Sequence, residues 1–328
     1  RMESLERRDL MSVDVIIGAE YAMGDRQLRI LGTETADEVT VFHEFGGRGT
    51  HVTFNGRTQV FTGVDHIYFD GGAGDDRFTN NTALPAIILG GAGDDTLEGG
   101  RFYDLIIGGD GDDRIDGRLG INVIYGDVPD KSTMTPSPFP SSYDWGKAVG
   151  HDVIDCGDGG TTTYGGPGDD IIVGGARTDA IWGGAGNDPI RGEGGFDMIG
   201  GGEGNDILRG GAGTDLLTGN EGNDILLGEA GDDLLFGGTG RDLLIGGSGC
   251  DSLNGSRPDV PILLGRRIAD HGDILIGGTT DYDANDEALM AILNIWNQPD
   301  SKSERIATLR AGIRILGMGS LNERTVHD

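Results

Sequence analysis

The residues best suited to chemistry in this sequence are aspartates that recur at every ninth position. Between Gly165 and Asn254 ten units of nine residues follow one another without a break, each with Gly at position one, Asp at position six and Ile or Leu at position eight. If such units stack, their carboxylates form a column spaced by about 4.8 Å, which needs a counter-charge. A hard divalent cation with oxygen ligands at about 2.3–2.6 Å fits, because the carboxylates supply charge and turn carbonyls complete the shell. The spacing therefore predicts calcium, which tolerates an irregular shell better than magnesium does.

The same nine-residue frame reaches beyond this run. Residues 147–155 and 156–164 stay in phase with it, so twelve units run in register. Four further units fill 90–125, and an isolated copy stands at 71–79. The stretch from Asn80 to Leu89 is one residue too long for the frame. Repetition on this scale indicates a solenoid rather than a compact domain.

The glycines determine the element that each unit can form. Gly at positions one, two and four permits the backbone angles of a tight bend, so we expect six residues of turn followed by three of strand. Side chains alternate along a strand, so position eight points inward and positions seven and nine point outward. We predict an all-β solenoid, a parallel β-roll with two nonapeptides in each coil of 18 residues. The expected narrow core is Ile172, Ile181, Ile190, Ile199, Leu208, Leu217, Leu226, Leu235, Leu244 and Leu253.

Composition agrees with a thin core and a cationic partner. Gly accounts for 63 of 328 residues, and aromatic residues make up only 6%, too little large apolar surface for one thick core. The formal net charge of -30 argues against nucleic acid and anionic lipid as partners. No stretch approaches the roughly 18 apolar residues of a membrane span. Cations are therefore the expected partners.

The motif GGxGxD with an aliphatic residue at position eight resembles the RTX, or haemolysin-type, calcium-binding repeat over about 71–125 and 147–254. The resemblance implies a parallel β-roll that folds on extracellular calcium and is exported, in many members, by a type I route. It also implies the metal ligands, which would be Asp76, Asp95, Asp113, Asp170, Asp179, Asp188, Asp197, Asp206, Asp215, Asp224, Asp233, Asp242 and Asp251.

The sequence departs from the motif at three positions, and each departure puts the calcium site of its repeat unit in doubt. Phe102 and Arg177 stand where the motif has Gly, and Asn122 stands where it has Asp. If every gap between stacked units of the ten-unit run is filled, about eight calcium ions are expected there. Residues 5–12, LERRDLMS, and the segment after the repeats resemble parts of planctomycete surface proteins, although Arg7 replaces the Pro of the leader pattern. This resemblance would make the chain a piece of a longer surface or secreted protein.

Catalytic motifs are weak in this sequence. His43-Glu44 begins like the zinc-protease motif HExxH, but Gly47 replaces the second His. The glycine-rich strings lack the GK[ST] of a phosphate-binding loop, and no GxSxG elbow is present. We therefore expect no enzyme and predict an extracellular or cell-surface structural or interaction module. Two alternatives stay open: a module that flanks a polysaccharide-modifying or proteolytic domain outside this chain, and an adhesin that binds extracellular polysaccharide. The adhesin would use the outer sheet face or the aromatic residues of the inserted loop, Phe139, Tyr143 and Trp145.

The expected organisation follows from where the frame starts and fails. Residues 1–70 are predicted to form a degenerate β cap, in which 32–40 is a worn copy and His51–Phe54 and His66–Phe69 are short strands. A Pro- and Ser-rich loop is inserted at 126–146, the in-register roll spans 147–254, and a degenerate repeat follows at 255–278.

Residues 279–328 are predicted to form a helical cap or linker. Leu289, Ile292, Leu293 and Trp296 make an apolar stripe at helical spacing. We expect this stripe to cover outward positions near the end of the roll, which are Ile225, Leu227, Leu243 and Ile245.

The two cysteines are predicted to be unpaired. Cys156 and Cys250 lie about five coils apart in the solenoid register, a separation too large for a disulfide.

Overall fold

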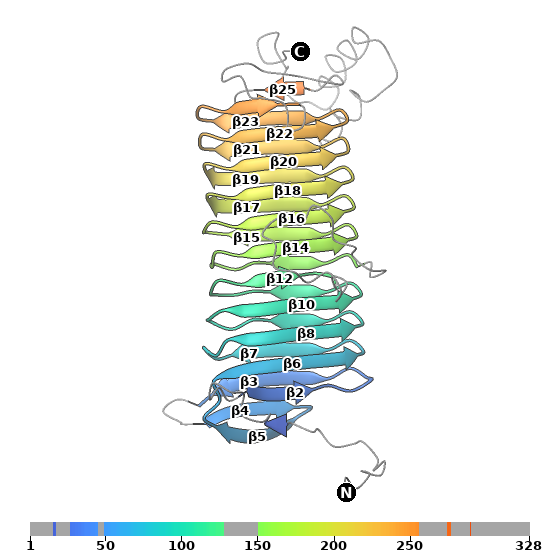
Figure 1. Cartoon of the computed structure of the whole chain (residues 1–328), viewed down its shortest axis with the longest axis vertical. Helices are drawn as coiled ribbons and strands as arrows, with labels where there is room; N and C mark the ends of the chain where they lie inside the picture. Colours follow the sequence, from blue (N-terminus) through green and yellow to red (C-terminus); the bar gives the residue numbers. More distant parts are fainter. Residues whose placement is uncertain are drawn as a thin grey trace, which may run out of the picture.

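The structure, a computed structural model, describes residues 16–17, 27–44, 49–127, 150–255, 274–276 and 289. In this part of the chain, strands stack in a long column from the blue end to the orange end, in sequence order except at the blue end (Figure 1). Successive strands of the repeats alternate between two sheets, so neighbours within a sheet are one whole coil apart. The chain is therefore an all-β parallel solenoid, as the sequence predicts.

The described strands form one sheet of 12 and one of 13. In spatial order the 12-stranded sheet contains β1 (Ile16–Ile17), β2 (Gln27–Leu31), β6 (His66–Ala73), β8 (Ala86–Ala92), β10 (Asp104–Asp110), β12 (Val123–Tyr125), β14 (Thr162–Pro167), β16 (Ala180–Ala185), β18 (Met198–Glu203), β20 (Leu216–Glu221), β22 (Leu234–Thr239) and β24 (Ser252–Asn254). The 13-stranded sheet contains β25 (Ile274–Ile276), β23 (Leu243–Ser248), β21 (Ile225–Ala230), β19 (Ile207–Gly213), β17 (Pro189–Gly195), β15 (Ile171–Gly175), β13 (Val153–Asp155), β11 (Arg114–Asp116), β9 (Thr96–Glu98), β7 (Arg77–Asn81), β3 (Glu38–His43), β4 (Gly49–Phe54) and β5 (Arg57–Thr62).

The strands of the unbroken run are longer than the sequence predicts. From β14 to β23 each strand has five to seven residues rather than three. The difference arises because the first glycines of the next unit also pair with the neighbouring coil, as Gly184 does with Gly202. The turn is correspondingly shorter, and the strands keep a strict register in which Ile181 pairs with Ile199.

The core lies between the two sheets and is one aliphatic residue wide at each strand. Every predicted position-eight residue of the run is at most 4% exposed, which confirms the expected core. Strand β20 shows the alternation, because Leu217 and Gly219 are buried while Leu216 and Thr218 are only half-buried. Position six, the aspartate, is buried as well. Each strand thus presents an aliphatic residue to the core between an aspartate and a glycine.

Antiparallel strands close the solenoid at its N-terminal end. Strand β1 pairs antiparallel with β2, and β3, β4 and β5 form an antiparallel meander. The strands predicted at His51–Phe54 and His66–Phe69 lie within β4 and β6. Asp37, in the worn copy, lies one coil below Asp76, since its backbone N–H donates to Asp76 Oδ1 at 2.7 Å.

The inserted loop leaves the solenoid in the middle of a turn. The N–H of Gly109 donates to Gly126 O, and the N–H of Asp127 donates to Gly165 O, so Gly126 and Asp127 occupy the first two positions of that turn. Gly150 resumes it, and Asp152 then accepts from Asp113 N at 2.8 Å. The sequence frame predicts residues 147–149 at the start of this unit, whereas the structure has Gly126 and Asp127 at its first two positions.

Residues 5–12, the aromatic residues of the inserted loop and the predicted C-terminal helices lie outside the described residues, except Leu289. That residue is helical and 1% exposed. The outward side chains Ile225, Leu227, Leu243 and Ile245 are at most 1% exposed. Within the described part, no helix is both long and apolar enough to cross a bilayer.

Candidate metal centre

The position-six aspartates form a column along each of the two edges where the chain turns from sheet to sheet. We call these the Asp76 edge, which runs from Asp76 to Asp242, and the Asp179 edge, which runs from Asp104 to Asp251. On both edges, Oδ1 of an aspartate accepts the backbone N–H of the residue one coil earlier. Asp170 N donates to Asp188 Oδ1 at 2.8 Å, and the register is 18 residues. The register widens to 19 residues at Asp95, because of the extra residue between 80 and 89, and to 39 at Asp152, because of the insertion.

The second oxygen of these carboxylates, Oδ2, has no hydrogen-bond partner in the described part of the chain, although it is buried. A buried carboxylate oxygen without a partner costs free energy, so atoms of this kind are suited to bind a cation. The aspartates with this arrangement are Asp76, Asp95, Asp113, Asp152, Asp170, Asp179, Asp188, Asp197, Asp206, Asp215, Asp224, Asp233 and Asp251. Asp242 continues the Asp76 edge, because its Oδ1 accepts Asp224 N at 3.0 Å.

In most units Oδ2 lies near a backbone carbonyl of the next coil, around a space that the glycine at position one leaves open. A Cβ added at Gly183 would collide with Asp188 Oδ2 and with the carbonyl oxygen of Gly201. The same pair of oxygens recurs around Gly165, Gly192, Gly210 and Gly228. The repeat therefore builds a series of oxygen-lined spaces between coils.

Burial raises the pKa of most column carboxylates above the ordinary Asp value. Burial, with the charges of Asp206 and Asp170 adding to it, raises the pKa of Asp188 to about 8. The pKa of Asp224 rises to about 8 and that of Asp152 to about 9, again chiefly through burial. The charged form is thus disfavoured unless a cation compensates it. A bound divalent cation would supply that charge.

The donor set fits calcium. No three His, Cys, Asp or Glu side chains converge on one point among the described residues, so backbone carbonyls must supply much of any coordination shell. Oxygen-only shells of carboxylates and carbonyls are those of calcium. Softer metals would require imidazole or thiolate ligands.

The Asp179 edge departs from this pattern over three consecutive turns. Both oxygens of Asp104 are satisfied, by the N–H groups of Ala86 at 2.8 Å and Gly100 at 2.7 Å. In the next turn, Asn122 Oδ1 accepts Asp104 N, and Asn122 Nδ2 donates to Gly117 O at 2.8 Å. Thr161 then takes the aspartate position. These three turns offer no unpartnered carboxylate oxygen.

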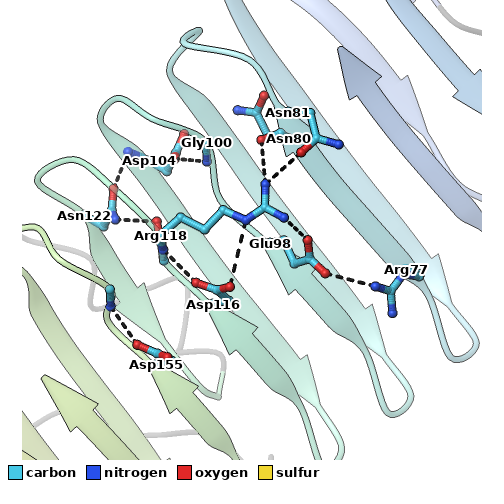
Figure 2. Close-up of polar contacts among 12 residues, drawn as sticks. Arg77, Asn80, Asn81, Glu98, Gly100, Asp104, Asp116, Arg118, Asn122 and Asp155 are labelled. Carbon is cyan, nitrogen blue, oxygen red and sulfur yellow. Dashed lines mark hydrogen bonds and ion pairs between the residues drawn. The ribbon is translucent and has the colours of Figure 1, made fainter. Parts of the chain in front are cut away.

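An arginine network crosses the same turns (Figure 2). The guanidinium of Arg118 forms an ion pair with Glu98, donates to Asn81 Oδ1 at 3.0 Å and lies 3.9 Å from Asp116. Arg77 binds the same Glu98 from a further coil at 2.9 Å. Direct side-chain contacts therefore connect coils where the aspartate column is interrupted.

The structure thus places all thirteen aspartates that were predicted as ligands in two columns, and Asp152, which the prediction omitted, lies in the same column as Asp113 and Asp170. Asp152 has the same buried, unpartnered Oδ2, and its unit at 147–155 keeps the frame of the run. Arg177 does not displace its own unit, since Asp179 stays in the column. Asn122, in contrast, departs from the motif and lies in one of the three turns where the aspartate column of the Asp179 edge is interrupted.

Comparison with known families agrees with this geometry. A family model described as the RTX calcium-binding nonapeptide repeat matches four segments, at 89–124, 164–199, 200–235 and 227–257. The chain carries RTX calcium-binding repeats. Three of these segments together cover 164–257, which contains the uninterrupted part of the aspartate column on each edge. No curated protein matches the chain.

Proposed function

We propose that this chain is an extracellular calcium-binding module whose RTX β-roll folds when calcium fills its aspartate columns. The observation that carries the proposal is the series of buried carboxylate oxygens without partners, most of them near a backbone carbonyl of the next coil. In such a fold the binding free energy of the metal is also folding free energy. An extracellular location fits, because calcium is abundant there and because RTX proteins are typically secreted or surface-exposed.

The ligands in this proposal are the thirteen predicted aspartates together with Asp152, each assisted by turn carbonyls. Bound calcium would neutralise charge between stacked coils and so hold the coils together. The turns of Asp104, Asn122 and Thr161 are held by direct hydrogen bonds instead. The proposal gives the chain a structural role and no catalytic one, and any catalytic domain would belong to a longer parent protein.

The alternative function, an adhesin that binds polysaccharide, has less support from the structure. Tyr125, Tyr164 and Trp182 stack along the 12-stranded sheet with ring centroids 5.0 and 4.9 Å apart. Their facing surfaces therefore contact one another, whereas sugars pack on exposed ring faces.

Calcium titration of the metal-free chain, followed by far-UV circular dichroism, tests the proposed function. We expect β-structure to rise cooperatively at millimolar calcium, the range of extracellular modules, and magnesium to fail. Asp215→Ala, in the middle of the Asp179 edge, should lower calcium affinity more than Asp251→Ala at its end, because an interior turn borders two gaps. Equal β-structure in chelator and in calcium would overturn the proposal.

A further inference from the structure

Asp127 occupies a position that is glycine in most turns of the Asp76 edge. The equivalent residues one coil away on either side are Gly109 and Gly166, both with positive φ. Asp127 N donates to Gly165 O at 3.1 Å, so its backbone belongs to the solenoid even though the insertion follows at once. A Cβ added at Gly166 would collide with Asp127 Oδ2. The carboxylate therefore reaches along the column toward the next turn.

This carboxylate is buried, and hydrogen bonds do not satisfy it. Asp127 is 0% exposed, and neither of its oxygens has a hydrogen bond of ordinary geometry among the described residues. The N–H of Gly150 donates to Pro167 O at 3.1 Å, and it lies close enough to Asp127 to lower the pKa of this carboxyl in part. Asp170 and Asp188, in the next coils of the column, each leave one oxygen without a partner, whereas Asp127 leaves two.

The charged side chains around Asp127 are acidic, so they do not compensate its negative charge. Burial, followed by the charge of Asp170 and then that of Asp110, raises the pKa of Asp127 to about 7. Asp127 in turn raises the pKa values of Asp113 and Asp152, after burial and the nearer members of the column. No cationic side chain contributes to any of these shifts. This gap between coils thus contains a buried carboxylate, that of Asp127, in addition to the column aspartates.

We propose that Asp127 makes a divalent-cation site at the point where the insertion leaves the solenoid, and that this site binds calcium more tightly than the remaining sites of the Asp76 edge. The site uses a side chain at a turn position where the neighbouring coils have only glycine. Asp152 and the turn carbonyls complete its oxygen set. An additional carboxylate ligand raises calcium affinity through its charge. The cation also ties Asp127 to Asp152, the described residues on either side of the insertion. The inference rests on the proposed function, since it assumes that the columns bind calcium.

Calcium binding to the full chain, measured by equilibrium dialysis and isothermal titration calorimetry, tests the site. We expect Asp127→Asn to remove the tightest step, with at least a tenfold loss of affinity, and to leave the later steps in place. Asp127→Gly introduces the residue that the neighbouring coils have at this position, so the turn can adopt its normal backbone. We expect this variant to show the same loss of calcium affinity. The matched control is Asp110→Asn, which removes an exposed charge near the same gap and should change affinity less than twofold.

The outcomes separate the two proposals. A wild-type chain that binds no calcium overturns the proposed function. A wild-type chain that binds calcium with unchanged steps in both Asp127 variants overturns the Asp127 site alone. A loss in Asp110→Asn as large as in Asp127→Asn also overturns it, because general negative charge would then explain the affinity.

Discussion

At the scale of single residues, glycine and aspartate depend on each other within each unit. Glycines at positions two and four have positive φ, as Gly184 and Gly186 show. Gly183, at position one, does not, so bending of the backbone does not explain why it is glycine. Its Cα faces Asp188 Oδ2 and the carbonyl of Gly201, and a side chain would fill the space between them. Glycine at position one therefore keeps open the space of the proposed metal site, and the turn does not require it.

A methyl group at position one should test this dependence. Gly183→Ala places its Cβ 2.8 Å from the carbonyl oxygen of Gly201 and against Asp188 Oδ2, so coils must move apart. We expect a loss of about 1–3 kcal/mol in the free energy of unfolding of the calcium-saturated chain. Gly194→Ala is the control, because its Cβ has no neighbour nearer than 3.7 Å and should cost less than about 0.5 kcal/mol. Equal denaturant midpoints for the two variants would show that position one tolerates a side chain.

At the scale of elements, the Asp179 edge shows how an amide can satisfy a turn without a metal ion. Asn122 occupies the column register, yet its Nδ2 donates to Gly117 O, whereas an aspartate would set one oxygen against another. The Arg118 network then connects the coils around it. Direct contacts therefore hold these turns together, in the role that we propose for calcium in the other turns.

Asn122→Asp should convert this turn into one that requires calcium. The new Oδ2 faces a carbonyl oxygen, and a buried group that loses its hydrogen bond costs about 1–3 kcal/mol. We expect a lower melting temperature in limiting calcium and about one additional bound ion at saturation. Asn205→Asp adds the same charge at an exposed position and should leave the stoichiometry unchanged. An Asn122→Asp chain with wild-type stoichiometry would contradict this account of the interruption.

How far the sequence predicts these elements depends on whether the interactions are local. The nine-residue period predicts the register, the core and the ligands, because each depends on position within a unit. Asp127 was not predicted, because the frame was read continuously through 147–155 whereas the chain completes that turn with residues from both sides of an insertion. Asp152 does stand at position six of that frame, but residues 147–149 lack the glycines of the motif. The Arg118 network joins residues up to 38 positions apart, and nothing in the period indicates where such a side chain will reach. Strand length was underestimated because glycine was expected to end a strand, whereas here it pairs across coils.

At the scale of the whole molecule, the stacked and buried carboxylates should destabilise the fold when no metal is bound. The formal net charge is -30, and the core is one aliphatic residue wide at each strand. Every coil along the Asp76 edge from Asp76 to Asp224 adds a buried carboxylate oxygen without a partner. Calcium and protons are the two ligands that can neutralise these groups, so they should compete for them.

Acid should therefore partly replace calcium. The pKa of Asp113, Asp188 and Asp224 is raised to about 8, and that of Asp152 to about 9, above the ordinary value of 3.8. Groups with a raised folded-state pKa favour the folded state when protonated. Their contribution is complete below about pH 4 and is lost as the pH rises through 8 to 9.

In calcium-free buffer we expect more β-structure and a higher melting temperature at pH 5 than at pH 8.5, measured by circular dichroism. The pH dependence should flatten in saturating calcium, because the ion then holds the carboxylates in their charged form. Apparent calcium affinity should rise with pH over the same range, since fewer protons need to be displaced. A calcium-free chain that is more ordered at pH 8.5 than at pH 5 would mean that the column carboxylates are not buried in the folded state.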